Sequence, residues 1–373
     1  MSKQLVPTGE DFEKEKVFFA TATEPDLVKR AEELEFSNKK SYVKCMRDHG
    51  ATRSYTNAVT SPPSPSPSIV YETRTIPQEF LKIDRIKPTP AKKGDEEHQI
   101  VVIGDQHVGH STVSFNSDSY IRRMKNFQKN TMLIASLHRN MYPLNELWML
   151  FLGDNVHGER VGKQVSLDEM DTMVDKYGTR HVMGVSNQIH DVLIPATVNC
   201  ILNFLQFYKV IHLRGVPGNH GANEKWNSLR CNWDLEYYRN LKSAFMHEKR
   251  VDADFEVDNF YQKVGIQDHT FFLVHGDQIP MHIGVPWFGI ERRVLNWNAS
   301  IKDFDYVVMG HFHFIGEDDV NGIPVFLNGT FCSDDKWTLN KLGKKGTLAQ
   351  RTLGVHKKEG VTWQYNVKLE KTP

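Results

Sequence analysis

The chain has 373 residues, enough for one large domain or two smaller ones, and its 46 basic residues balance its 46 acidic ones. This balance favours no class of partner. Four scattered cysteines without a Cys-x-x-Cys pair argue against a cysteine-based zinc site and a disulfide framework. The first residues are polar and charged, and no apolar run approaches the ~20 residues of a membrane span. We therefore expect a cytoplasmic protein without a membrane contact.

The first 60 residues predict a small helical module. A helical pattern runs from Glu24 to Gly50 with a break at 35–37. The apolar face of the first helix is expected to contain Leu27, Val28, Ala31 and Leu34. Two short helices joined by a tight turn resemble a helix-turn-helix that binds DNA. The residues that would contact DNA are Lys39, Lys40, Lys44 and Arg47. The alternative is a structural or docking hairpin that contacts a protein partner or a second copy of the chain.

A proline-rich stretch follows this module. Ser61 to Ser68 reads SPPSPSPS, and its prolines block helix and ladder hydrogen bonds. We therefore predict that residues 61–97 are a linker and connecting segment, and that residues 98–373 form a catalytic domain.

From His98 onward, strand-like apolar runs alternate with longer amphipathic segments, which indicates an α/β fold. The predicted strands are 100–103, 147–152, 210–213, 270–274 and 306–309. The predicted helices are 120–139, 192–208 and 233–246. After Ile315, turns at Asn321-Gly322 and Asn328-Gly329 and short strands within 351–368 predict a second, more antiparallel sheet.

Each of the five predicted strands ends in a polar cluster that contains glycine. In chain order, the clusters contain Asp105 and His107; Asp154, Asn155 and His157; Asn219 and His220; His275 and Asp277; and His311 and His313. Ligands of open α/β sheets bind outside the carboxyl ends of the strands, so five such ends can converge on one pocket. The glycines suit tight turns and close backbone approach. Any one cluster alone is more often a turn, a helix cap or a core histidine, but together they predict a metal site.

The residue types suit a pair of divalent metal ions. Carboxylates, imidazoles and amide oxygens bind first-row metals, and we expect Mn²⁺, with Fe, Zn²⁺ or Mg²⁺ as alternatives. A carboxylate can bridge two ions ~3.5–4 Å apart, as in two-metal phosphoester sites. Two aspartates against two such ions leave roughly +2 at the centre, which would attract a phosphate ester. A metal-bridging water or hydroxide would then attack phosphorus in line.

The order Asp-x-His, Gly-Asp, Gly-Asn-His, His-Gly and Gly-His-x-His resembles the signature of the calcineurin-like metallophosphoesterase superfamily, over about residues 98–335. The resemblance implies two packed mixed β-sheets flanked by helices, with a dinuclear centre at one edge. It implies first-metal ligands Asp105, His107 and His313, a bridging Asp154, and second-metal ligands Asn219, His275 and His311. It also implies that His220 is a catalytic histidine that contacts the phosphate and protonates the leaving oxygen.

The chain departs from that pattern after His220. The family often continues with an acidic residue that orients and charges the histidine, but this chain has Gly221. Glu224 or Asp277 is a candidate for that carboxylate.

His157, three residues after Asp154, tilts the expected substrate towards DNA. A histidine at this offset resembles the SbcD-like DNA repair nucleases, where it contributes to catalysis. Asn155 resembles phosphatase members instead, and the alternative for His157 is a surface turn. Candidate substrate-binding residues, in stretches where aromatic and basic residues alternate, are Lys225, Trp226, Arg230, Arg292 and Arg293. The alternative for those stretches is helices packed on the sheet.

We predict a two-metal phosphodiesterase that acts on DNA, a nuclease with catalytic residues His220 and His157. The first alternative is a phosphomonoesterase, or a phosphatase of small molecules or phosphoproteins from the same superfamily. The second is a DNA-binding protein with a vestigial catalytic domain.

Overall fold

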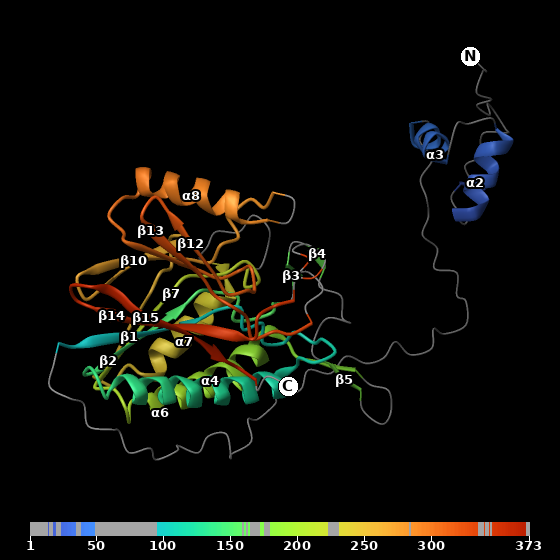
Figure 1. The fold of residues 1–373 in the computed structure, drawn as a ribbon. Coiled ribbons are helices and arrows are strands. Elements are labelled where there is room, and N and C mark those ends of the chain that lie inside the picture. The colour runs from blue at the N-terminus through green and yellow to red at the C-terminus, as the bar shows by residue number, and fades with distance from the viewer. Residues whose placement is uncertain are drawn as a thin grey trace. The chain divides into compact units, whose positions relative to one another are not determined.

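The computed structural model describes residues 24–34, 39–48, 95–158, 180–222, 231–282, 285–334 and 345–370, together with a few isolated positions. The chain divides into two compact units, Met1–Ser66 and Pro67–Pro373 (Figure 1). The predicted linker over 61–97 lies outside the described residues up to position 94.

The N-terminal unit contains the two predicted helices, α2 (Glu24–Glu33) and α3 (Lys39–Asp48). Leu27 and Ala31 of α2 pack against Tyr42 and Met46 of α3. Val28, which was predicted on the buried face, is 44% exposed, because it lies about 100° around the helix from Leu27. The turn between the helices lies outside the described residues, so the helix-turn-helix geometry stays a prediction.

The first sheet of the larger unit has six strands in the order β15-β14-β1-β2-β7-β8. Strands β1, β2, β7 and β8 run parallel to one another, whereas β14 is antiparallel to both β1 and β15. The bounds are β1 Glu97–Ile103, β2 Glu146–Phe151, β7 Val210–Gly215, β8 Val251–Phe255, β14 Ala349–His356 and β15 Gly360–Lys368.

The second sheet has five strands in the order β12-β13-β11-β10-β9 and is also mixed. The bounds are β9 Tyr261–Ile266, β10 His269–Val274, β11 Tyr306–Met309, β12 Gly316–Val320 and β13 Ile323–Leu327. Asn321 and Gly322, both with positive φ, join β12 to β13 as the predicted hairpin turn. The described residues also include two two-stranded pairs, β3 (Arg160–Val161) with β4 (Lys163–Gln164) and β5 (Thr172–Val174) with β6 (Arg180–Val182).

The predicted division of the strands between the sheets was wrong. Strands β10 and β11 belong to the second sheet, whereas β14 and β15 extend the first. The predicted turn at Asn328-Gly329 does not join two paired strands, because β13 before it lies in the second sheet and β14, the next described strand, lies in the first. The Asn328 side chain donates to Gln350 Oε1 (2.8 Å), and a Cβ at Gly329 would lie 2.2 Å from the Ala349 carbonyl oxygen. These residues pass from one sheet to the other, and strand periodicity alone does not report which sheet a strand joins.

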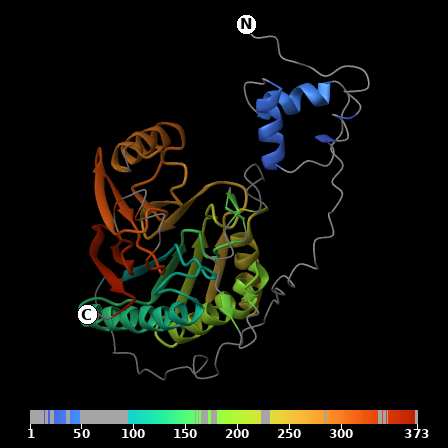
Figure 2. The same ribbon diagram turned by 90° about the vertical axis from the view of Figure 1, so that its right-hand side faces the viewer.

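Helices cover the outer face of each sheet (Figures 1 and 2). An apolar layer of buried side chains lies between the sheets. Helices α4 (Ser117–His138), α6 (Ile194–Phe204) and α7 (Trp233–Ala244) contribute to the core on the first sheet, and α8 (Trp287–Ser300) to the core on the second. The inter-sheet layer includes fully buried residues from both sheets, among them Ile100, Leu150, Phe271 and Leu273. This arrangement confirms the predicted α/β class with two packed mixed sheets. Among the described residues, no helix is both long and apolar enough to cross a membrane.

The predicted helix over 192–208 starts earlier than expected. A short α5 (Val185–Asn187) leads into a π-helical turn, η3 (Gln188–Leu193), before α6. Such π-helical turns are frequent at functional sites.

Candidate metal centre

The carboxyl ends of β1, β2, β7, β10 and β11 meet at one edge of the two sheets. Asp105 N donates to Gly153 O (3.1 Å), and Gly310 N donates to His275 O (2.9 Å). Within the described residues, three groups have ligand atoms within 4.8 Å of one another and could hold a metal ion: Asp105, His107 and His313; Asp154, His275 and His311; and His107, His157 and His220.

The first cluster joins the start of the domain to a residue 206 positions later. His107 Nε2 lies 3.0 Å from His313 Nε2, and His313 Nε2 lies 3.3 Å from Asp105 Oδ1. All three side chains are buried. One carboxylate oxygen and two imidazole nitrogens therefore face one point.

The second cluster is built around His275. Its Nε2 lies 3.1 Å from Asp154 Oδ2, 3.1 Å from Asn219 Oδ1 and 3.2 Å from His311 Nδ1. Its Nδ1 lies 2.7 Å from the carbonyl oxygen of Leu152 and donates a hydrogen bond to it. That bond sets the ring orientation, because it commits Nδ1 to the carbonyl and turns Nε2 towards the cluster.

Backbone amides link the two clusters. His311 N lies 3.0 Å from Asp105 Oδ2, and His220 N donates to Asp154 Oδ1 (2.7 Å). Each aspartate therefore holds a strand end in place with the same carboxylate that faces the cluster.

Five of the seven predicted ligands have a left-handed backbone, an uncommon conformation for residues other than glycine. The φ angles are 51° for Asp105, 48° for His107, 50° for Asp154, 69° for His311 and 58° for His313. Such residues cost about 1–3 kcal/mol each and cluster at functional sites. The strain therefore marks this edge independently of the side-chain types.

Two glycines allow the close approach of neighbouring strand ends. Gly153 has φ 81°, and a Cβ there would lie 2.2 Å from Gly218 N. A Cβ at Gly218 would lie 2.2 Å from Asp154 Oδ1. A larger residue at Gly218 would push the Asp154 carboxylate away from its partners, and one at Gly153 would push the backbone of Gly218 away.

Burial and the electrostatic interactions among these side chains determine which of them are charged. Burial lowers the pKa of His107 and of His311 well below the usual range, so both are neutral. Burial also opposes charge on His275, but the carboxylates of Asp154, Asp105 and Asp277 together outweigh it and raise the pKa of His275 to about 10. Burial favours the neutral acid at Asp154, but His275 and His220 hold its pKa well below the usual range. In the metal-free protein the ionised Asp154 therefore lies beside a protonated His275 and a neutral His311. A divalent cation bound there would displace the His275 proton, because it needs deprotonated ligands.

His220 lies beside both clusters. Its ring centroid is 4.5 Å from that of His107, and its Nδ1 lies 3.2 Å from the carbonyl oxygen of His157. The carbonyl group therefore orients His220 in the way a carboxylate was expected to. Glu224 lies outside the described residues, and Asp277 is exposed and bonds to Gln278.

Neither His157 nor Asn155 is an exposed residue of a surface turn. His157 is buried, and its ring centroid lies 5.9 Å from that of His107 and 5.2 Å from that of His220. Asn155 is also buried, but its side chain donates to Asp234 Oδ1 (3.0 Å) and Tyr238 Oη (3.0 Å). Asn155 therefore stabilises the loop and is not among the clustered ligand atoms.

Asp234 supports the site and was missed by sequence reasoning. It is fully buried, and its carboxylate accepts from the backbone N–H groups of Asp154 (2.9 Å), Asn155 (3.0 Å) and Gly218 (2.9 Å). Burial and the Asp154 charge raise its pKa. The sequence signal is weak, because Asp234 looks like an ordinary acidic residue in the first turn of α7, two positions after the N-cap Asn232.

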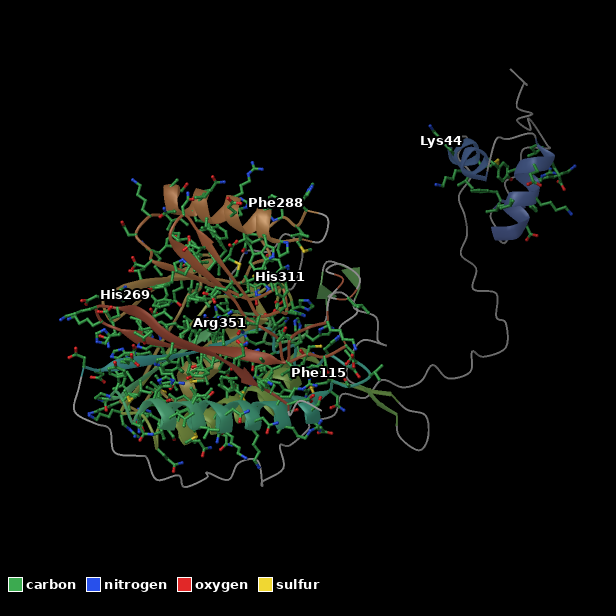
Figure 3. All side chains as sticks on the ribbon, viewed as in Figure 1. Lys44, Phe115, His269, Phe288, His311 and Arg351 are labelled. Carbon is green, nitrogen blue, oxygen red and sulfur yellow. The ribbon has the colours of Figure 1, made fainter. Side chains whose placement is uncertain are left out.

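The predicted substrate-binding residues are only partly described. Lys225, Trp226 and Arg230 lie outside the described residues. Arg292 and Arg293 are exposed on α8. Trp297 packs in the core of the second sheet, as the alternative interpretation expected, whereas Phe288 is 69% exposed at the start of α8 (Figure 3).

Comparisons with known proteins give only distant similarities. No protein-family model matches the chain, and no curated protein is similar to it. Among solved structures, the chain is similar to zinc-bound Vps29 from Entamoeba histolytica (12% identity, TM-score 0.30, 72% of this chain and 99% of that one). It is also similar to a novel archaeal phosphodiesterase (14%, TM-score 0.32, 72% and 99%) and to Vacuolar Protein Sorting 29 from Cryptosporidium parvum (14%, TM-score 0.34, 73% and 100%). These values are too low to assign a family, so the site itself has to indicate the function.

Proposed function

We propose that this chain is a metal-dependent phosphoesterase that hydrolyses phosphodiester bonds, with DNA as its substrate. The observation that carries the proposal is the pair of His/Asp clusters at one sheet edge, with His220 against both. One ion would be held by Asp105, His107 and His313. A second would be held by Asn219, His275 and His311, and Asp154 would bind both ions. When bound, two divalent ions, Mn²⁺ in this proposal, stabilise charge on the phosphate oxygens and supply a nucleophile at neutral pH.

The side chains around these ligands have complementary tasks. Because the Nδ1 proton of His220 is donated to the His157 carbonyl, Nε2 is left for the substrate. In its protonated form, His220 can donate the Nε2 proton to the leaving oxygen. Asp234 holds the Asp154 and Gly218 amides, so the ligand loops are positioned before substrate binds.

Two observations support DNA as the substrate. His157 lies in the same group as His107 and His220, where a scissile diester phosphate would be bound. In the N-terminal unit, Lys40 and Lys44 are exposed on α3, and Lys44 projects from that helix (Figure 3). Exposed lysines on a helix suit contact with DNA phosphates, and a tethered DNA-binding unit would raise the local concentration of substrate.

A substrate panel with metal replacement tests the proposal. Protein stripped with EDTA is reloaded with Mn²⁺, Mg²⁺, Zn²⁺ or Fe²⁺ and incubated with labelled single- and double-stranded DNA, bis-p-nitrophenyl phosphate and p-nitrophenyl phosphate. We expect metal-dependent cleavage of DNA and of the model diester. Rapid turnover of the monoester without DNA cleavage would instead show a phosphomonoesterase. No turnover with any metal would contradict the phosphoesterase proposal itself.

A further inference from the structure

His110 contacts the site although no motif in the sequence pointed to it. Its Nδ1 lies 3.0 Å from His157 Nε2, and the two rings are tilted at 35° with centroids 4.0 Å apart. Both side chains are buried. We propose that His110 is a positioning residue that holds the His157 imidazole against His107 and His220. This inference rests on the proposed function, because it assigns His110 to the same reaction.

The backbone around His110 is built to place it. Gly109 has φ 95°, and the turn closes with a bond from His110 N to His107 O (3.0 Å). A Cβ at Gly109 would lie 2.3 Å from the side chain of Gln188, so this turn packs directly on Gln188. The turn that carries the predicted metal ligand His107 therefore also positions His110.

Gln188 joins that turn to the one that carries His157. Its Oε1 accepts from His157 N (3.1 Å) and Gly158 N (3.3 Å), and its Nε2 donates to Met183 O (3.1 Å). Gln188 is the first residue of the π-helical turn η3. One buried amide thus sets the spacing between the backbones that carry the two rings.

The contact also extends to His220. The His157 carbonyl oxygen lies 3.2 Å from His220 Nδ1, while the His157 ring bonds to His110. His157 is therefore held by its side chain on one side and orients His220 with its backbone on the other. Without the His110 ring, the space beside the His157 imidazole is empty. The imidazole can then rotate into that space, away from the phosphate position.

The expected effect is on turnover rather than on substrate affinity. The proposed metal ions and the basic surfaces bind the substrate, whereas His157 contributes at the reacting phosphate. Misplacing such a group by about 1 Å can reduce the rate about 100-fold. We expect His110→Ala to lower kcat on DNA about 10- to 100-fold with little change in KM.

Two conservative variants separate positioning from general packing. The amide nitrogen of Asn lies near the position of histidine Nδ1, whereas that of Gln lies nearer Nε2. Since the contact uses Nδ1, His110→Asn should recover most of the turnover and His110→Gln should recover little. His247→Ala removes an exposed histidine beyond α7 and serves as the control with unchanged turnover.

A double-mutant cycle tests whether His110 acts through His157. If it does, His110→Ala should have little further effect once His157→Ala is present. Equal losses of turnover from His110→Ala in both backgrounds would overturn the inference.

A readout on metal-free protein separates this inference from the proposed function. In side-chain ¹H–¹⁵N spectra of histidine-labelled protein, the His157 signal is the one lost in His157→Ala. It should shift in His110→Ala and stay in place in His247→Ala. A stationary signal would overturn the contact. If the signal shifts but wild-type protein cleaves no phosphoester with any metal, the proposed function fails, and the positioning role fails with it.

Discussion

The amino ends and the carboxyl ends of the parallel strands carry similar side chains in different environments. At the amino ends, His212 Nε2 lies 2.9 Å from Glu146 Oε2 and its Nδ1 lies 3.0 Å from Asp252 Oδ2, while Trp148 stacks on its ring at 3.9 Å. At the carboxyl ends lie the two candidate metal clusters. Histidines and carboxylates are thus gathered at both ends, and residue type alone does not separate a metal site from a structural cluster.

Backbone conformation and burial do separate them. Five of the predicted ligands at the carboxyl ends have positive φ, whereas Trp148, Glu146, His212 and Asp252 all lie in regular strands without it. Asp252 is 52% exposed and pairs with Arg214 at 2.6 Å, so its charge is both solvated and balanced. The carboxyl-end aspartates are buried among histidines. A buried, strained cluster is the one that a bound cation would stabilise.

The largest expected difference between the two ends is in turnover. Asp154→Asn removes the proposed shared ligand and should lower metal-dependent phosphodiester turnover at least about 100-fold, with a parallel loss of bound metal. Glu146→Gln, at the amino ends, should leave both unchanged. Steady-state kinetics and metal analysis by mass spectrometry make the measurement. Comparable losses in the two variants would show that the carboxyl-end cluster is not the catalytic centre.

A smaller effect is expected from the support beneath the ligands. Asp234→Asn keeps the side-chain size but turns one acceptor into a donor that faces backbone N–H groups. We expect metal affinity to fall about 10- to 100-fold and the free energy of unfolding to fall by about 1–3 kcal/mol. Asp252→Asn is the matched change at the other end and should alter neither quantity appreciably. Calorimetric metal titration and denaturant unfolding test both, and unchanged metal affinity in Asp234→Asn would contradict the supporting role.

A third expected effect is a pH dependence of stability in metal-free protein. The pKa of His275 is raised from 6.5 to about 10 by Asp154, with help from Asp105 and Asp277, against the opposing effect of burial. This stabilisation is complete below about pH 6.5 and is lost as the pH rises towards 10. The Tm in EDTA should therefore fall across that range, and His275→Gln should flatten the slope. Metal affinity should rise over the same range, because the ion takes the place of the proton. A Tm in EDTA that stays level from pH 6.5 to 10 would argue against the His275–Asp154 pair.

Much of the fold follows from local patterns. The five predicted strands correspond to β1, β2, β7, β10 and β11, and the predicted helices to α4, α6 and α7. These elements were predictable because hydrophobic periodicity and turn residues act over a few neighbouring positions. The assignment of β14 and β15 to a separate sheet failed, because sheet membership depends on contacts between distant parts of the chain. Every residue of β14 is buried in the first sheet, beside β1 about 250 positions earlier.

The sequence alone determined which residue types make up the candidate site, because each predicted ligand and its glycine neighbours lie next to each other at a strand end. The tertiary structure decided how those ends work together. It brought His313 to His107, placed Asp234 beneath two ligand loops and set His110 against His157. These contacts join residues 47 to 206 positions apart. They depend on the packing of two sheets and a π-helical turn, and no local sequence pattern records such packing.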